Sequence, residues 1–331
     1  MLKEMIEKLM LRQHLTYQES ALSIQEMVQC GNAPQIAAFL TLMRSKGETV
    51  DELYGVITAM RQLMCSLKAQ GPLLDIVGTG GDGAHTVNIS TGAAILTASC
   101  GVKVAKHGNR SVSSRCGSAD VLEALGINIQ MAPEKIAECL DKIGIGFMFA
   151  PCFHPAMHAL KEVRGQLRVR TIFNLIGPLL NPAATEHLMI GVCNEKLVEL
   201  LAEVLFRLGT KKSLVFHGNG LDELSCIGPA KAIEVTQEGM KAIEINPKKL
   251  GFSACKSEDL CGGDAAYNAQ LLTRAFCGEN SAIKDTLVLN AAVAMQLVGT
   301  TATIEEGIAK AKAAIVVNQP LQLLEEWRQY G

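Results

Sequence analysis

The chain has 331 residues, of which 48% are hydrophobic, 19% charged and only 4% aromatic. This composition is typical of a globular protein with a sizeable core, and the length predicts about two domains. Because 31 Lys and Arg nearly balance 33 Asp and Glu, the net charge of −2 argues against a broad basic surface for nucleic acid or an anionic membrane. We expect neither as a partner, so any anion site must come from local segregation of charge.

The cysteines and the apolar stretches predict a cytoplasmic protein. The eleven cysteines form no C-x-x-C pair and no cluster at zinc spacing, so we expect reduced thiols rather than disulfides or a structural metal. Acidic residues near the N-terminus favour an amphipathic helix over a secretory signal. Asn290, Gln296 and Gly299 interrupt the uncharged stretch 286–304, which favours a buried helix over a membrane span.

The predicted elements divide the chain into two parts. Thr16-x-x-Glu19 and Thr49-x-x-Glu52 are capping-box patterns that open helical runs in the first 70 residues. From residue 73, short apolar runs alternate with longer helical ones, which predicts an α/β fold with a mostly parallel central sheet flanked by helices. The predicted strands are 73–77, 102–105, 146–150, 188–192, 214–217, 232–235 and 242–245. The predicted helices of this part are 90–100, 119–125, 133–143, 156–167, 195–208, 265–276, 285–298, 304–317 and, after a break at Pro320, 321–330.

We therefore expect a small helical domain over 1–70 and a larger α/β domain over 71–331. An insertion at about 155–182 is expected to pack back against the helical domain. A cleft between two such domains is a common place for a substrate site.

A glycine-rich loop follows the first predicted strand. Gly78-Thr79-Gly80-Gly81-Asp82-Gly83 has the Gly-x-Gly-x-x-Gly spacing of dinucleotide sites, which also require an acid at the end of the next strand. No Asp or Glu occurs between Ala84 and Ala119, and the next strand leads into Lys106-His107. The loop therefore favours phosphate over NAD, with a plain tight turn as the alternative.

A basic loop follows the second strand. The acid-free window from Ala84 to Ala119 carries a charge of +4, which leaves −6 for the rest of the chain. Residues 106–115 mix Lys and Arg with serines, a combination that can wrap a polyphosphate through charge, hydroxyls and backbone N–H groups. Loops after adjacent parallel strands converge at one sheet edge, so this loop is expected beside the glycine loop. The alternative is a solvated basic loop.

An acidic pair lies in a third glycine-containing loop. Asp222-Glu223 follows Gly218-Asn219-Gly220 after the predicted strand 214–217. Mg²⁺ takes one or two carboxylates together with waters and substrate phosphates, so a nearby polyphosphate site makes this pair a candidate magnesium ligand. A solvated turn is the alternative.

These loops and several further segments resemble the anthranilate phosphoribosyltransferases along the whole chain. The matching segments are Gln35–Leu40 (QIAAFL), Lys46-Gly47-Glu48-Thr49, Gly78–Asp82 (GTGGD), Asn88-Ile89-Ser90-Thr91, Lys106-His107-Gly108-Asn109-Arg110, Gly117-Ser118-Ala119-Asp120, His154-Pro155-Ala156-Met157, Arg170–Asn174 (RTIFN), Gly177-Pro178, Asn181-Pro182 and Gly220-Leu221-Asp222-Glu223. The resemblance implies a homodimer of the nucleoside phosphorylase-like fold. It also implies transfer of phosphoribosyl from phosphoribosyl pyrophosphate (PRPP) to the amino group of anthranilate, in tryptophan biosynthesis.

The resemblance further assigns roles to individual residues. PRPP would be held by Gly78, Gly81, Asp82, Thr86, Asn88, Ile89, Ser90, Thr91, Lys106, His107, Gly108, Asn109, Arg110, Ser111, Val112, Ser113, Ser114 and Ser118. Anthranilate would contact Gly78, Asn109 and Arg164, with His107, Pro151, His154 and Pro178 along its access route. The cofactor would be two Mg²⁺ ions on Ser90, Asp222 and Glu223. The catalytic residues would be Lys106, Asn109 and Arg164.

Departures from the family pattern lie on the acceptor side, at Phe153, His158 and residues 165–168. Two other functions stay open. One is a pyrimidine nucleoside phosphorylase-like enzyme, against which the intact glycine loop, basic loop and acidic pair argue. The other is a non-enzymatic relative that binds nucleic acid through basic loops.

Overall fold

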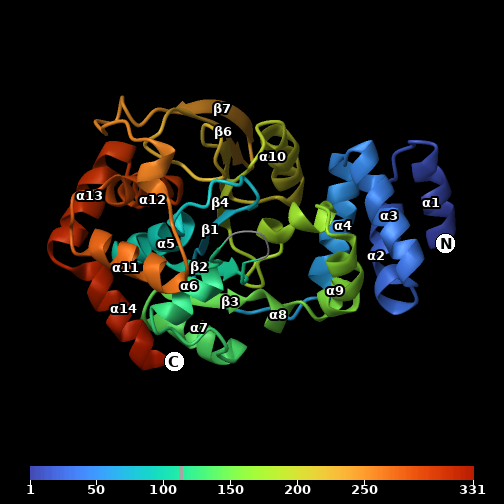
Figure 1. Ribbon diagram of the computed structural model, residues 1–331, viewed down its shortest axis with the longest axis horizontal. Coiled ribbons are helices and arrows are strands. Elements are labelled where there is room, and N and C mark those ends of the chain that lie inside the picture. Colours follow the sequence, from blue (N-terminus) through green and yellow to red (C-terminus); the bar gives the residue numbers. More distant parts are fainter. Residues whose placement is uncertain (112–114) are drawn as a thin grey trace.

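The computed structural model describes residues 1–111 and 115–331, in which a helical bundle stands beside a larger α/β part (Figure 1). The bundle contains α1 (Leu2–Met10), α2 (Tyr17–Gln29), α3 (Ala33–Lys46) and α4 (Val50–Leu63). The later helix α9 (Pro155–Leu167) packs against α2, α3 and α4. The segment that follows the third strand thus returns to the N-terminal helices.

Both predicted capping boxes are present at the starts of bundle helices. At α2, Glu19 N donates to Thr16 Oγ1 at 3.2 Å, and Thr16 N donates to Glu19 Oε2 at 3.0 Å. At α4, the corresponding bonds between Thr49 and Glu52 measure 3.3 and 2.9 Å. Each box satisfies N–H groups that the first helical turn leaves without intrahelical partners.

The central sheet has seven strands in the order β3-β2-β1-β4-β5-β6-β7. β1 to β5 are parallel, whereas β6 and β7 form an antiparallel hairpin at one edge. The strands are β1 (Leu74–Gly78), β2 (Val104–Gly108), β3 (Ile145–Phe149), β4 (His187–Gly191), β5 (Lys212–His217), β6 (Ala230–Thr236) and β7 (Gly239–Ile245). Because β1, β2 and β5 are parallel, the three loops predicted to bind ligand leave the same edge of the sheet.

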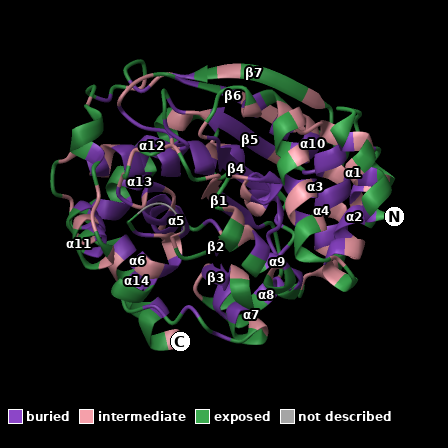
Figure 2. Cartoon of the chain, turned by 45° about the vertical axis from the view of Figure 1, so that its right-hand side comes forward, coloured by how far each residue is buried: buried purple, intermediate pink, exposed green. Residues whose placement is uncertain are grey.

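Two apolar cores lie on opposite faces of the sheet (Figure 2). In β4, Leu188 and Ile190 belong to the core shared with the bundle and α10, while Met189 belongs to the core beneath the other helices. The helices of this part are α5 (Ile89–Ser99), α6 (Ser118–Ala124), α7 (Pro133–Lys142), α8 (Ala150–Phe153), α10 (Leu197–Leu208), α11 (Ala265–Phe276), α12 (Ala282–Leu297), α13 (Ile304–Val316) and α14 (Gln319–Tyr330). Three short 3₁₀ helices are η1 (Ile172–Asn174), η2 (Gly177–Leu179) and η3 (Ser257–Leu260). The predicted fold class, a helical bundle plus an α/β domain, is confirmed.

The expected break at Pro320 is wrong. α14 begins at Gln319 and includes Pro320 in its first turn. A proline is tolerated there, because backbone N–H groups of the first turn have no intrahelical acceptor. The chain breaks instead at Asn318, whose φ of 59° is left-handed. Much of the uncharged stretch 286–304 lies in α12, which is packed against α5, and no helix among the described residues is long and apolar enough to cross a bilayer.

A buried ion pair generates the first prediction. Lys46 and Glu52 lie 2.9 Å apart with side chains 3% and 0% exposed, and Glu52 also accepts a hydrogen bond from Leu15 N at 2.8 Å. In Glu52→Ala the buried Lys46 ammonium would keep only the uncharged partners Gly47 O and His14, and the α4 capping box would lose its carboxylate. We expect the free energy of unfolding to fall by about 3–5 kcal/mol, measured by urea denaturation. Glu7→Ala, which breaks an exposed pair with Lys3, is the control with a loss below about 1 kcal/mol. Equal losses in the two variants would contradict the prediction.

Candidate active site

The loop after β1 turns on glycines with positive φ. Gly80, Gly81 and Gly83 have φ of 69°, 83° and 75°, values that side-chain-bearing residues rarely adopt. The loop is closed by Asp82, whose Oδ1 accepts a hydrogen bond from Ala84 N at 3.0 Å. This backbone has the freedom that is needed to turn N–H groups toward an anion.

Polar residues at the start of α5 are tied to distant parts of the chain. The Asn88 side chain donates to Cys116 O at 3.1 Å and accepts from Asn268 Nδ2 at 2.9 Å. Ser90 N donates to Glu223 Oε1 at 3.1 Å. Other residues predicted to bind PRPP on this stretch are Thr86, Ile89 and Thr91. The start of α5 is therefore hydrogen-bonded to Cys116 after the second loop, to Glu223 of the third loop and to Asn268.

Lys106 lies under these loops rather than in solvent. Its side chain is 1% exposed, and Nζ donates to Ile76 O at 2.7 Å and Ser90 Oγ at 3.5 Å. Burial lowers the pKa of Lys106, an effect opposed by the negative charges of Asp75 and Glu223. The ammonium is thus a desolvated donor at the edge of the sheet, where an anion would find little competing water.

Asp222 reaches the glycine loop across an intervening strand. Gly80 N donates to Asp222 Oδ2 at 2.5 Å, although β4 separates β1 from β5. The crossing depends on Gly191 at the end of β4, because a Cβ there would lie 1.7 Å from Asp222 O. A Cβ at Gly78 would likewise lie 2.3 Å from Asp222 Oδ2. Gly191 therefore makes room for the backbone of Asp222, and Gly78 makes room for its carboxylate.

Three carboxylates gather where the first and third loops meet. Burial, followed by repulsion from Asp82, raises the pKa of Asp222, and burial, followed by repulsion from Asp222, raises that of Glu223. Among the described residues, no three His, Cys, Asp or Glu side chains are arranged to enclose a metal ion by themselves. The donor set fits Mg²⁺, since this cation is usually held by one or two carboxylates and takes its other ligands from waters and phosphates.

The second loop contains its own ion pairs. The guanidinium of Arg110 contacts Asp120 at 3.0 Å and Glu123 at 2.5 and 2.9 Å, so acids outside the acid-free window compensate this cation. Ser118 Oγ donates to Asn109 O at 3.2 Å. The predicted residues Val112, Ser113 and Ser114 lie outside the described part of the chain. Gly108 and Ser111 lie on either side of Asn109 and Arg110.

Two histidines that were predicted to line the access route of the acceptor face each other. His107 Nε2 and His154 Nε2 are 3.1 Å apart, and both side chains are buried. Burial lowers the pKa of His107 to about 3 and that of His154 to about 4, so both rings are neutral near pH 7. Two neutral rings can share one N–H···N hydrogen bond.

Arg164 lies in the last turn of α9, half-buried, with its guanidinium 5.1 Å from the centre of the Phe173 ring. Burial lowers its pKa. No ion pair with Arg164 occurs in the described ranges, so its planar fork is available to a carboxylate.

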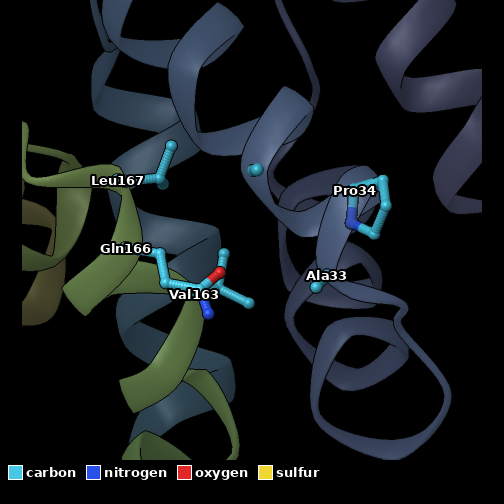
Figure 3. A pocket seen from close by; sticks show the side chains of 6 residues that line it. Ala33, Pro34, Val163, Gln166 and Leu167 are labelled. Carbon is cyan, nitrogen blue, oxygen red and sulfur yellow. The ribbon is translucent and has the colours of Figure 1, made fainter.

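Two prolines were also predicted to line the access route of the acceptor, and a separate pocket lies elsewhere on α9. Pro151 is in α8 and Pro178 in η2, next to Gly177, whose backbone is hydrogen-bonded to His107. A pocket of about 310 Å³ lies between α3 and α9 (Figure 3). Its lining residues are Ala33, Pro34, Ala37, Val163, Gln166 and Leu167. None of them was predicted to bind a ligand.

Sequence reasoning missed a buried network below the loops. Asp75 Oδ1 accepts from His107 N at 3.3 Å, and Asp75 Oδ2 accepts from Asn181 Nδ2 at 2.7 Å. Asn181 also donates to Ala105 O at 2.8 Å. The sequence contains one signal for this network: Asp75 is a lone acid inside an apolar strand, and a buried carboxyl group needs hydrogen-bond partners. This network holds β1, β2 and the η2 segment together.

The comparisons with known proteins agree with this geometry. Residues 3–64 match the helical bundle domain of a glycosyl transferase family, and residues 70–317 match its a/b domain. The chain is 47% identical to the anthranilate phosphoribosyltransferase of Chlamydia caviae, over 100% of this chain and 97% of that protein. It is 42% identical to that of Geobacter sulfurreducens, over 98% of each.

Solved structures show the same likeness. The crystal structure of anthranilate phosphoribosyltransferase from Thermus thermophilus has a TM-score of 0.92 at 38% identity, covering 98% of both chains. The enzyme from Saccharomyces cerevisiae in complex with PRPP and Mg has a TM-score of 0.92 at 25% identity, covering 99% of this chain and 97% of that one.

Fold and loops define a glycosyl transferase built from a helical bundle and an α/β domain. Within that class, the chain belongs to the anthranilate phosphoribosyltransferase family. The predicted family is therefore confirmed, while the roles of single residues stay predictions.

The histidine pair generates a prediction about acid stability. Because the folded pKa values lie below the ordinary value of 6.5, the unfolded chain binds more protons and stability falls as the pH drops from about 6.5 toward 4. Each neutral histidine costs about 1.4 kcal/mol per pH unit in that range. We expect His154→Gln to flatten the decline of the free energy of unfolding, measured by urea denaturation across this range.

Three carboxyl groups whose pKa values are raised by burial act in the opposite direction, and their contribution cancels in the comparison because both proteins contain them. They are Asp75, Asp222 and Glu223. The exposed His158 gives the matched control His158→Gln, for which the wild-type pH dependence is expected. Identical pH dependence in His154→Gln and the wild type would contradict the neutral pair.

Proposed function

We propose that the protein transfers the phosphoribosyl group of PRPP to the amino nitrogen of anthranilate. The products would be N-(5-phosphoribosyl)anthranilate and pyrophosphate, in a step of tryptophan biosynthesis. The observation that carries the proposal is the carboxylate pair of buried Asp222 and half-buried Glu223, which contacts the glycine loop and the start of α5. It is supported by the similarity of the whole chain to anthranilate phosphoribosyltransferases.

The donor would lie across the first two loops. N–H groups of the glycine loop, the Ser90 and Thr91 hydroxyls and buried Lys106 would face its phosphates. We propose two Mg²⁺ ions, held by Ser90, Asp222 and Glu223. When bound, Mg²⁺ would neutralise negative charge on the pyrophosphate.

The reaction requires stabilisation of a leaving group more than it requires a base. Breaking the anomeric C–O bond leaves positive charge on the ribose and negative charge on pyrophosphate, so a desolvated cation such as Lys106 assists departure. The aniline nitrogen of anthranilate carries a free electron pair near pH 7 and needs no deprotonation before it attacks. The proton released from the nitrogen as the new C–N bond forms would pass to the departing pyrophosphate or to water. Because no base is needed before the attack, the reaction is compatible with a histidine pair that is neutral and buried.

Orientation of the acceptor would fall to Arg164 and Asn109. A planar guanidinium forms two parallel hydrogen bonds with a carboxylate, and its position over Phe173 limits its rotation. Holding the carboxylate fixes the direction of the amino group on the same ring, which lowers the entropic part of the barrier.

The first test measures loss of anthranilate fluorescence with purified protein, PRPP and Mg²⁺. We expect consumption that needs all three, and Glu223→Gln should raise the Mg²⁺ requirement and slow turnover. No consumption by folded protein would overturn the proposal. Phosphorolysis of thymidine or uridine without Mg²⁺ would instead support the nucleoside phosphorylase alternative.

Arg164→Ala tests the acceptor half separately. Loss of a charge-assisted contact worth about 1.5–3 kcal/mol should raise the KM for anthranilate roughly 10- to 100-fold, with a much smaller change in the KM for PRPP. Steady-state kinetics with each substrate varied in turn measures both. The control is Lys161→Ala, which removes an exposed cation from the same helix. A change in PRPP affinity alone would contradict the assigned role.

Three further expectations belong to the same proposal. We propose a homodimer and a cytoplasmic location, and a helical domain of residues 1–70 joined by residues 155–182. The packing of α9 on α2, α3 and α4 supports this division of the chain.

A further inference from the structure

The Arg170 guanidinium is hydrogen-bonded to two carbonyl groups of the glycine loop. Its Nη1 donates to Gly81 O at 3.0 Å and its Nη2 donates to Gly80 O at 2.9 Å. The guanidinium fills space that only glycine leaves free, because a Cβ on Gly81 would lie 1.5 Å from Nη1. Arg170 has a position in the RTIFN segment but no role among the binding and catalytic residues assigned above.

These two hydrogen bonds set the direction of two peptide groups. In a planar trans peptide the C=O and the following N–H point in opposite directions. Because Arg170 holds the carbonyls of Gly80 and Gly81, the N–H groups of Gly81 and Asp82 point away from it. Neither N–H donates to another residue in the described part of the chain. Successive N–H groups turned the same way form a concave anion site.

Arg170 is itself held at both ends. On one side, Arg168 ends α9 in a left-handed conformation with φ of 51°. On the other, buried Thr171 precedes η1 and its N donates to Asn174 Oδ1 at 2.9 Å. The side chain therefore extends from a fixed piece of backbone, and its two hydrogen bonds to the glycine loop restrict its rotamers before the donor binds.

We propose that Arg170 is a positioning residue that directs the Gly81 and Asp82 N–H groups at phosphate oxygens of the donor. The inference rests on the proposed function, since it takes PRPP as the ligand of this loop. It predicts that Arg170, which follows the helix carrying the proposed acceptor residue Arg164, controls affinity for the donor.

The test compares Arg170→Ala and Arg170→Lys with the wild type and with Lys161→Ala. Titration calorimetry measures binding of PRPP with Mg²⁺ to the full chain without acceptor. We expect binding roughly 10- to 100-fold weaker in Arg170→Ala and intermediate in Arg170→Lys, since lysine restores at most part of the fork. Lys161→Ala should bind as the wild type does, and the KM for anthranilate at saturating PRPP should change far less than the PRPP affinity.

The outcomes separate two kinds of failure. If the wild type binds no PRPP, the proposed function fails. If the wild type binds PRPP and Arg170→Ala binds it equally well, the positioning role is overturned. The role is also overturned if the affinity lost in Arg170→Ala is not partly recovered in Arg170→Lys while the thermal unfolding midpoint falls in both, because that pattern reports a purely structural residue.

Discussion

The hydrogen bond from Gly80 N to Asp222 Oδ2 joins the loops of two strands that are not neighbours. The arrangement at this edge of the sheet depends on it, because the bond brings Asp222 and the neighbouring Glu223 to a loop whose own single carboxylate is Asp82. It exists only where β4 ends in glycine, since a side chain at Gly191 would occupy the path of Asp222. The site therefore depends on the space that glycines leave as much as on its polar side chains.

Charge at the site is organised by burial rather than by net charge along the sequence. The acid-free window carries four cations, but Lys103 is paired with Asp141 and Arg110 with Asp120 and Glu123. Lys106 is different because it lies inside the fold. The desolvated charge of Lys106 lies near the negative charges of Asp75 and Glu223. These few desolvated charges therefore contribute more to the binding of phosphate and Mg²⁺ than the net charge of +4 on residues 84–119 does.

Apolar periodicity and capping patterns were sufficient for most strands and helices, because they report local structure, and the motif segments were sufficient for the family. The capping boxes at Thr16 and Thr49 are such local patterns. The sequence was not sufficient for contacts between distant loops. Nothing around Gly191 or Arg170 indicates that each meets a residue far away in the sequence, and the Pro320 error arose because proline both starts and interrupts helices.

The two ends of α9 connect the acceptor side to the sheet. Before the helix, His154 meets His107 at the end of β2, and after it, Arg170 meets the loop that follows β1. A helix fixed at both ends to adjacent strands cannot shift without moving one of these contacts. Arg164, carried in its last turn, therefore has its position defined by the same two loops that would bind the donor. The geometry of acceptor and donor is in this way set by one connected piece of backbone rather than by two independent domains.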